Sequence, residues 1–280
     1  MKPPAFTYHR PRSLEETLDV LASLGERGKV LAGGQSLVPL MSMRLSAPEH
    51  LVDINHVPGL DGVFVDEDVV RIGALARHSA VEHDAAAYAA VPLLRQALRL
   101  VAHPTIRNRG TTVGSLVHGD PAAEMPAVLR LLDGWVTLRS VSGSRDVDAA
   151  DFFTGPMETA VRPGELAVSA TFRRPPAGAT SAFVEVSRRQ GDYAVCGAGA
   201  VVSGGELRVA LVSVADGPVL ADLSSAYDGA VLDPAAARDL VDAVIEPEGD
   251  IHTSADYHRH LAHVLVARAV HETREEVSAA

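Results

Sequence analysis

The chain has 280 residues, of which 47% are hydrophobic and 22% are charged, and its formal net charge at pH 7 is −11. This composition is typical of a soluble globular protein with one large domain or two to three small ones. The acidic balance argues against binding to nucleic acids or anionic membranes, because both reward clustered Lys and Arg. No apolar run is long enough for a transmembrane helix, and the start MKPPAFTYHRPRS lacks the apolar core of a signal peptide. We therefore expect a cytoplasmic protein.

Cys196 is the only cysteine in the chain. It cannot form an internal disulfide, and one thiolate cannot hold an iron–sulfur cluster or a Cys-type zinc site. Any redox chemistry must then come from a bound organic cofactor or from partner proteins. We interpret Cys196 itself as a small apolar residue within a strand.

The first predicted elements are a helix, a strand and a glycine turn. Ser13 and Glu16 fit a capping box at the start of a helix that Gly25 ends. A strand at 30–32 follows and runs directly into Gly-Gly. The next elements, in order, are a strand at 50–55, a hairpin at 63–75, a second capping box at Ser79–Glu82, a helix at 92–102, a long polar loop at 103–120, a helix at 122–132, a hairpin at 135–147 and a strand at 165–172.

The pattern changes after residues 175–179, PPAGA, which form the best candidate for a domain boundary. Three strands follow, AFVEVSRR, GAGAVV and ELRVALVSV, and then helices at about 234–245 and 255–275. The mixture of hairpins and helices, without steady βαβ alternation, predicts an α+β fold. We expect a domain of residues 1–176, with subdomains of about 1–56 and 57–176. A smaller domain, 178–280, would contain a three-stranded sheet and helices.

Four histidines, at 252, 258, 260 and 263, invite a metal-site interpretation. They lie at a helix start and along a polar face, without partner carboxylates at fixed spacing, so no metal site is predicted.

The stretch VLAGGQSLVPLM, residues 30–41, exposes backbone between two apolar runs. Backbone N–H groups at a glycine turn can point at an anion, and glycine, lacking Cβ, lets a phosphate come close. Taken alone this is a weak signal, because most Gly-Gly pairs after a strand are simply turns.

A second stretch of the same character is HPTIRNRGTTVGSLVHGDPAAEMP, residues 103–126. Loops of this length are usually functional or disordered, and its apolar residues at 113, 116 and 117 argue against disorder. Two segments rich in Gly, Ser and Thr suit a ligand with two phosphates, such as a dinucleotide. Neither is a P-loop or a Rossmann fingerprint. Arg107 and Arg109 are interpreted as salt-bridged loop anchors, and His103 and His118 as polar loop residues.

The pair AGGQSLVPLMSMRL and TIRNRGTTVGSLVHGDPAAEMP resembles the FAD-binding medium subunit of the molybdenum hydroxylases, the family of carbon monoxide dehydrogenase and xanthine dehydrogenase. SRRQGDYAV, residues 187–195, resembles a third landmark, a loop beside the isoalloxazine ring. The resemblance covers essentially the whole chain. It implies a two-part FAD-binding domain of the PCMH/VAO-like type, followed by a smaller domain of antiparallel sheet and helices.

The resemblance also implies a set of cofactor-binding residues and FAD as the cofactor. They are Ala32, Gly33, Gly34, Gln35, Ser36 and Leu37 in the first segment, Thr111, Gly114, Ser115, Asp120 and Glu124 in the second, Val101 near the adenine end, Leu166 where the chain passes the flavin ring, and Asp192 and Tyr193 in the third. Tyr193 would stack on or gate the isoalloxazine and is the one tentative catalytic residue. The family's usual Thr-Ile-Gly-Gly reads Thr111-Thr112-Val113-Gly114 here, and the backbone donor survives this change if φ at Val113 is negative.

The implied function is electron transfer. A large molybdopterin subunit would oxidise the substrate, a small 2Fe-2S subunit would carry the electrons, and FAD in this chain would pass them to a small-molecule acceptor. One alternative is a self-contained FAD-dependent oxidase or dehydrogenase acting on a small molecule. Another is a cofactor-free binding protein that retains the fold. The substrate, the acceptor, the identities of the partners and the oligomeric state are not determined by the sequence.

Overall fold

The structure, a computed structural model, describes residues 2–279 and the side chains of residues 2–274. The helices are α1 (Leu14–Leu24), α2 (Leu37–Ser42), α3 (His78–His83), α4 (Ala85–Ala90), α5 (Pro92–Leu98), α6 (Pro104–Arg107), α7 (Thr112–His118), α8 (Glu124–Leu131), α9 (Ala149–Phe152), α10 (Pro234–Asp242) and α11 (Ala255–Ala279). The strands are β1 (Thr7–His9), β2 (Gly28–Leu31), β3 (His50–Asp53), β4 (Val63–Val65), β5 (Val69–Gly73), β6 (Trp135–Ser140), β7 (Gly143–Asp148), β8 (Phe153–Gly155), β9 (Glu158–Thr159), β10 (Leu166–Arg173), β11 (Thr180–Ser187), β12 (Ala194–Ser203), β13 (Glu206–Val212) and β14 (Val219–Asp222). The predicted α+β fold is confirmed.

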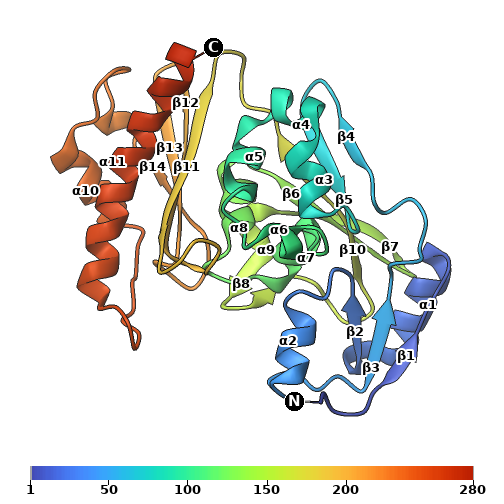
Figure 1. Cartoon of the computed structure of the whole chain (residues 1–280). Helices are drawn as coiled ribbons and strands as arrows, with labels where there is room; N and C mark the ends of the chain where they lie inside the picture. The colour runs from blue at the N-terminus through green and yellow to red at the C-terminus, as the bar shows by residue number, and fades with distance from the viewer. Residues whose placement is uncertain (1, 280) are drawn as a thin grey trace.

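The N-terminal subdomain is a small parallel sheet of order β1-β3-β2 with α1 packed on it (Figure 1). The predicted N-cap of α1 is confirmed, since Ser13 Oγ accepts a hydrogen bond from the Glu16 N–H at 3.1 Å. Leu18 and Leu21 on one face of α1 are buried with Val52 and Ile54. This subdomain presents the end of β2 to the rest of the molecule.

A five-stranded antiparallel sheet, β4-β5-β10-β6-β7, forms the second part, with α5, α7 and α8 over it. The polar loop expected at 103–120 is wrong, because α6 and α7 occupy most of it. Thr111 caps α7 by accepting the Gly114 N–H, and Gly119 ends it with φ +63°. The apolar residues Val113 and Leu116 lie on the buried face of this short helix.

The second predicted capping box is also wrong. The helix there, α3, begins at His78 after Arg77, and no side chain caps it. Glu82 cannot act as a capping residue because its carboxylate pairs with Arg107 at 2.8 Å. A tertiary ion pair has replaced the local interaction that the sequence pattern favours.

The C-terminal sheet has the order β11-β12-β13-β14, so it has four strands and not the three expected. The four-residue β14 follows the turn containing Gly217-Pro218 and pairs with β13, and it is too short to show a period in the sequence. The α10–α11 pair covers one face of this sheet, and α5 and α8 pack on the other (Figure 1). We call this second contact, between α5 and α8 and the C-terminal sheet, the seam.

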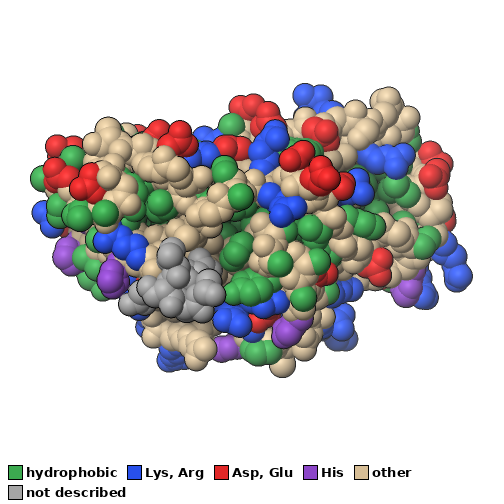
Figure 2. Space-filling model, turned by 90° about the horizontal axis from the view of Figure 1, so that it is seen from above, with side chains coloured by type: hydrophobic (Ala, Val, Ile, Leu, Met, Phe, Trp, Pro, Cys, Tyr) green, Lys and Arg blue, Asp and Glu red, His purple; other side chains and the backbone are tan. Residues whose placement is uncertain are grey.

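The surface seen in Figure 2 carries interspersed acidic and basic side chains, so the net negative charge is spread and mixed on that face. None of the helices in residues 2–279 combines the length and the apolar character needed to cross a membrane.

Candidate functional site

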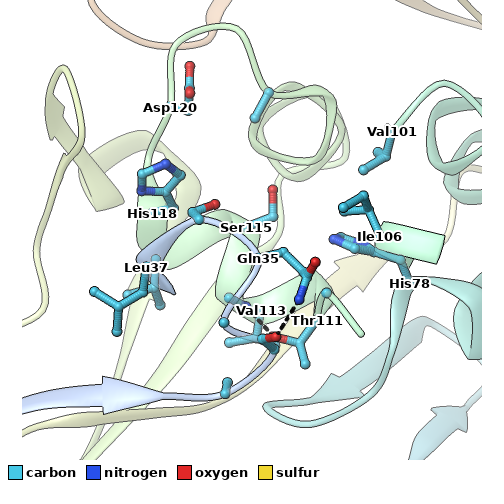
Figure 3. Close-up of a pocket in the computed structure, with 18 of the residues that line it drawn as sticks. Gln35, Leu37, His78, Val101, Ile106, Thr111, Val113, Ser115, His118 and Asp120 are labelled. Carbon is cyan, nitrogen blue, oxygen red and sulfur yellow. Dashed lines mark hydrogen bonds between the residues drawn. The ribbon is translucent and has the colours of Figure 1, made fainter. Parts of the chain in front are cut away.

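A cleft with a volume of about 370 Å³ lies where the N-terminal subdomain, the α6–α8 region and the loop before β12 meet. Every predicted cofactor-binding residue lines it: Ala32, Gly33, Gly34, Gln35, Ser36, Leu37, Val101, Thr111, Gly114, Ser115, Asp120, Glu124, Leu166, Asp192 and Tyr193. Three segments that are far apart in the sequence therefore meet at one place. Figure 3 shows Gln35, Ser115, His118 and Asp120 from two of them around the same cavity.

The glycine turn, residues 32–36, packs directly on the backbone before α7. A Cβ on Gly33 would lie 2.4 Å from the Arg109 carbonyl oxygen and 2.8 Å from the Gly110 Cα. Gly34 has φ +70°, in the left-handed region that favours glycine. Both glycines are thus required by the fold of the site itself, one by close approach and one by its backbone conformation.

The glycine turn leaves backbone donors free at the cleft. Among the residues that the structure describes, none accepts a hydrogen bond from the N–H groups of residues 33–36. The Gln35 side chain turns back and donates to the Gly33 carbonyl at 3.0 Å, which braces the turn (Figure 3). Unpaired N–H groups of this kind require an acceptor from water or from a ligand.

The first turn of α7 adds one more donor. Thr111 Oγ1 accepts the Gly114 N–H at 3.1 Å, and the Thr112 N–H donates to the Ala76 carbonyl. The Val113 N–H has no acceptor within residues 2–279, and Val113 is helical with negative φ. Its side chain is buried in the core, so the replacement of the family's usual glycine by Val113 keeps the backbone donor.

Two residues that the sequence reasoning missed join these segments. Asn55 Nδ2 donates to the Ala32 carbonyl at 2.8 Å. Arg77 donates to Asn55 Oδ1 and to the Arg109 carbonyl, both at 2.6 Å. This chain of hydrogen bonds holds the glycine turn against the segment before α7. The sequence carries no motif that marks either residue, because their partners lie far away in the sequence.

His78 is a third residue without a sequence signal. Its buried ring lines the cleft, with Nδ1 3.3 Å from Thr112 Oγ1. Burial, aided by the charge of Arg107, lowers the pKa of His78 to about 4. The ring is therefore neutral at physiological pH and adds no positive charge to the cleft.

The opposite end of the cleft lies at the seam. The loop 191–193 packs against His103, since a Cβ on Gly191 would lie 2.6 Å from the His103 ring. Tyr193 stands in this loop, just before β12, with its side chain 66% exposed. Val101 precedes His103 by two residues and lies at this same end. Leu166 instead belongs to the hydrophobic cluster of the N-terminal subdomain. We call residues Val101, Asp120, Glu124, Asp192 and Tyr193 the seam end.

Carboxyl groups gather at the seam end. Glu124, in the first turn of α8, is only 7% exposed. It forms no hydrogen bond or ion pair with another residue that the structure describes. Burial raises the pKa of Glu124 to about 8, and the charges of Glu185 and Asp120 act in the same direction. Burial likewise raises the pKa of Glu185, on β11, to about 7, and its Oε2 is buried without a partner.

Arg107 is confirmed as an anchor. Its guanidinium pairs with Glu82 and donates to the carbonyls of Val101 and Ala102, each at 3.0 Å. The same interpretation is wrong for Arg109, which forms no ion pair with the side chains of residues 2–274. Its carbonyl oxygen, not its charge, is used.

The histidine positions 252–263 are dispersed over the C-terminal domain. The His258 ring lies 2.6 Å from Thr253 Oγ1 and 3.1 Å from the Ser213 carbonyl. His263 lies 3.1 Å from an Asp242 carboxylate oxygen, a carboxylate partner that the sequence did not predict. Within the described part of the chain, no three His, Cys, Asp or Glu side chains are placed to hold a metal ion.

The residues of the cleft fit a dinucleotide. The glycine turn and Val113 supply free backbone donors for phosphate oxygens, and a side chain at Gly33 would collide with the backbone beneath it. Apolar residues along the cleft, including Val30, Ile54 and Ile106, provide surface for rings.

Comparisons with known proteins point the same way. Residues 4–172 match the family described as FAD binding domain in molybdopterin dehydrogenase, and residues 181–273 match the CO dehydrogenase flavoprotein C-terminal domain. The chain is 38% identical to the 6-hydroxypseudooxynicotine dehydrogenase complex subunit alpha of Paenarthrobacter nicotinovorans, over 98% of this chain and 97% of that protein. It is 36% identical to the carbon monoxide dehydrogenase medium chain of Afipia carboxidovorans, over 98% of each chain.

A solved structure gives the same picture. A carbon monoxide dehydrogenase chain from Hydrogenophaga pseudoflava superposes with a TM-score of 0.91 at 36% identity, over 97% of this chain and 98% of that one.

Proposed function

We propose that this chain carries electrons from a partner subunit to an external acceptor. The premise is that the chain belongs to the FAD-binding medium subunits of the molybdenum hydroxylase family, with FAD as its cofactor. Bound FAD would accept electrons one at a time and pass them on singly or in pairs. The chain's own residues bind the cofactor, orient it and control access to it.

The glycine turn and the first turn of α7 hold the pyrophosphate in this proposal. The support is the set of free N–H groups at residues 33–36 and 113. Ser115, which faces the same cavity in Figure 3, adds a hydroxyl. Among the residues that the structure describes, no Lys or Arg side chain lines the cleft, so in this proposal neutral backbone donors take the place of cationic ones. This is the observation that carries the assignment of the phosphate end.

The seam end receives the isoalloxazine ring. Asp120 and Asp192 would repel a pyrophosphate there, whereas the flavin ring is uncharged when oxidised. Val101 and Tyr193 would then flank the ring, and Leu166 would contact the adenosine part. This order would exchange the roles that the resemblance suggested for Val101 and Leu166; its support is that Val101 precedes His103 by two residues, and the His103 ring packs against Gly191.

The partners are proposed from the division of labour in the family. The chain's single cysteine is buried, and burial raises the pKa of Cys196 to about 12, so this thiol is not a cluster ligand. Iron–sulfur clusters must belong to a small 2Fe-2S subunit, and the molybdenum centre to a large molybdopterin subunit. Tyr193, exposed at the mouth of the cleft, would gate the approach of the electron acceptor.

The test is purification of the tagged chain from its own cells under native conditions. We expect a yellow protein that releases FAD on heating, together with two co-purifying chains that contain molybdenum and iron. Substrate oxidation by the isolated FAD-loaded chain, without those partners, would contradict the proposal and favour a self-contained flavoenzyme. A chain that binds no FAD in any of these forms would contradict the site assignment.

A further inference from the structure

Reduction of a flavin by iron–sulfur clusters raises a question of proton supply. Oxidised flavin takes up two electrons and one proton to form the reduced anion, and the proton binds at N5. One-electron carriers of the iron–sulfur class deliver electrons without protons. A protein that delivers electrons in this way must therefore supply the proton by another route.

Glu124 is placed to supply it. The side chain lines the cleft at the seam end, next to the position proposed for the flavin ring. It is more than nine-tenths buried, and it has no hydrogen-bond or ion-pair partner among the other residues that the structure describes. A carboxylate buried in this way is strongly disfavoured, whereas a carboxylic acid is tolerated and can donate a proton.

Glu185 approaches from the other side of the seam. In the β11–β12 ladder it is directly opposite Gly197, and it lies two residues from Phe183. Its side chain therefore points to the same face as Phe183, whose ring packs in the core that includes α8. Gly197 contributes no side chain on that face, which leaves room for a carboxyl with one unpartnered buried oxygen.

The charged side chains that act on Glu124 are acidic. The titratable side chains that act on Glu124 are Glu185 from β11 and Asp120 from the loop before α8, and Tyr193 from the loop before β12 is in turn affected by both Asp120 and Glu124. His118 at the end of α7 lines the same cleft, and the buried Cys196 thiol lies on β12. Neither Glu124 nor Glu185 pairs with a Lys or Arg of the described part of the chain, and the charge of Glu185 raises the cost of ionising Glu124.

We propose that Glu124 donates the proton that flavin N5 takes up on reduction, and that Glu185, across the seam, keeps Glu124 protonated and returns a proton to it from solvent. In the donation step, the O–H bond of Glu124 breaks and the N5–H bond forms, which leaves a carboxylate. In the return step, that carboxylate regains a proton. The proposal rests on the proposed function, because it requires the ring at the seam end.

The experiment uses the full-length chain loaded with FAD. A laser flash with 5-deazariboflavin and EDTA delivers electrons quickly, and protonation of the reduced flavin is followed through its visible absorption. In Glu124→Gln we expect protonation to slow by about a hundredfold, while electron arrival keeps its rate. Glu124→Asp should recover part of the loss. Glu206→Gln, an exposed residue on β13 of the same sheet, is the matched control.

A second readout needs no flash. The infrared difference spectrum between reduced and oxidised protein should contain a carboxylic-acid C=O band that Glu124→Gln removes and Glu206→Gln retains. Glu185→Gln should move the pH at which this acid ionises to lower values, because it removes a neighbouring negative charge.

The outcomes separate the two proposals. If the wild-type chain binds no FAD, the proposed function fails. If Glu124→Gln binds FAD normally and protonates it at the wild-type rate, the proton-donor role is overturned and the cofactor assignment stands. If Glu124→Gln loses FAD, the Glu185→Gln variant decides the question. An unchanged pH of ionisation for the carboxylic-acid band in this variant overturns the role of the pair, and a lower pH supports it.

Discussion

The glycine turn and the seam end differ in the kind of group that they present to the cleft. The glycine turn offers backbone N–H groups, carries no charged side chain and is packed so closely that a Cβ on Gly33 would lie 2.4 Å from a carbonyl oxygen. The seam end offers side chains, among them a buried carboxyl and an exposed tyrosine. In the proposed function, the first region would therefore act through its close packing and its backbone donors, and the second through protonation and access.

The two regions should consequently respond differently to mutation. A small added side chain should damage the glycine turn whatever its charge. At the seam end, a change of charge at constant shape should matter most, and a change of shape at the exposed tyrosine should leave affinity alone.

The largest effect on FAD affinity is expected for Gly33→Ala. Its methyl group would meet the Arg109 carbonyl and the Gly110 Cα, both of which are backbone atoms that cannot move aside cheaply. FAD affinity should fall by at least about a hundredfold, which corresponds to about 3 kcal/mol. Titration of the apo chain with FAD, followed by flavin fluorescence, measures this. Gly217→Ala is the control, because its Cβ would lie 3.8 Å from Phe153 and fits without strain. Equal affinities in the two variants would break the comparison.

The next effect concerns the ion pair behind the seam end. Arg107→Ala leaves Glu82 without its partner and frees the carbonyls of Val101 and Ala102. Removing one member of a buried pair costs about 3–5 kcal/mol of unfolding free energy. Urea unfolding at neutral pH measures the loss. The exposed pair Arg268–Glu272 provides the control, since Arg268→Ala should cost no more than about 1 kcal/mol.

The third prediction is a pH dependence of stability due to Glu124. Its pKa is about 8 in the folded chain against 4.5 in the unfolded chain, so the folded state binds more protons between these values. This group's contribution to stability is therefore complete below pH 4.5 and declines as the pH rises, by roughly 3 kcal/mol at pH 7.

Glu124→Gln should abolish that decline, so its stability relative to wild type should increase from pH 4.5 to pH 7. Urea unfolding of the apo chain across this range measures the difference in unfolding free energy between the two proteins. Because only Glu124 differs between them, this difference isolates its contribution from those of Glu185 and the other titrating groups. Parallel pH profiles for the two proteins would mean that Glu124 is ionised when folded, and the contrast between the two ends would lose its chemical basis.

The smallest effect on affinity is expected for Tyr193→Ala. The side chain is 66% exposed, so its loss should change FAD affinity by about 0.5 kcal/mol or less. The rate at which acceptors reoxidise the reduced flavin should nevertheless change, because Tyr193 stands at the mouth of the cleft. Stopped-flow reoxidation with oxygen and with a quinone measures this. An unchanged rate would count against gating.

Much of the candidate site could be predicted from the sequence, because its parts are local. A strand followed by Gly-Gly, a Thr N-cap before α7 and a short loop before β12 are each encoded within a few residues, and all of the predicted residues line one cleft. The helix α1 was equally readable, since its cap and its leucine face are local features.

Other elements could not be read in this way. The segment 103–120 has too few apolar residues to show a helical period, and α6 and α7 form there because Arg107, Val113 and Leu116 find buried partners elsewhere. The Ser79–Glu82 pattern does not form a capping box, because Glu82 forms an ion pair with Arg107, which is distant in the sequence. Strand β14 is defined by its hydrogen bonds to β13, because its four residues are too few to show a recognisable sequence pattern.

The sequence by itself determined the fold class, the resemblance and the segments that line the cleft, because short-range backbone preferences and glycine positions are encoded in consecutive residues. Only the tertiary structure brought these segments together around one cleft. The chain of Asn55 and Arg77 that joins the two glycine segments depends on contacts between residues that are far apart in the sequence. So do the neighbourhood of Val101 and Tyr193 and the buried, unpaired carboxyls at the seam. Burial and desolvation arise from the whole packed molecule, and no local pattern of residues carries them.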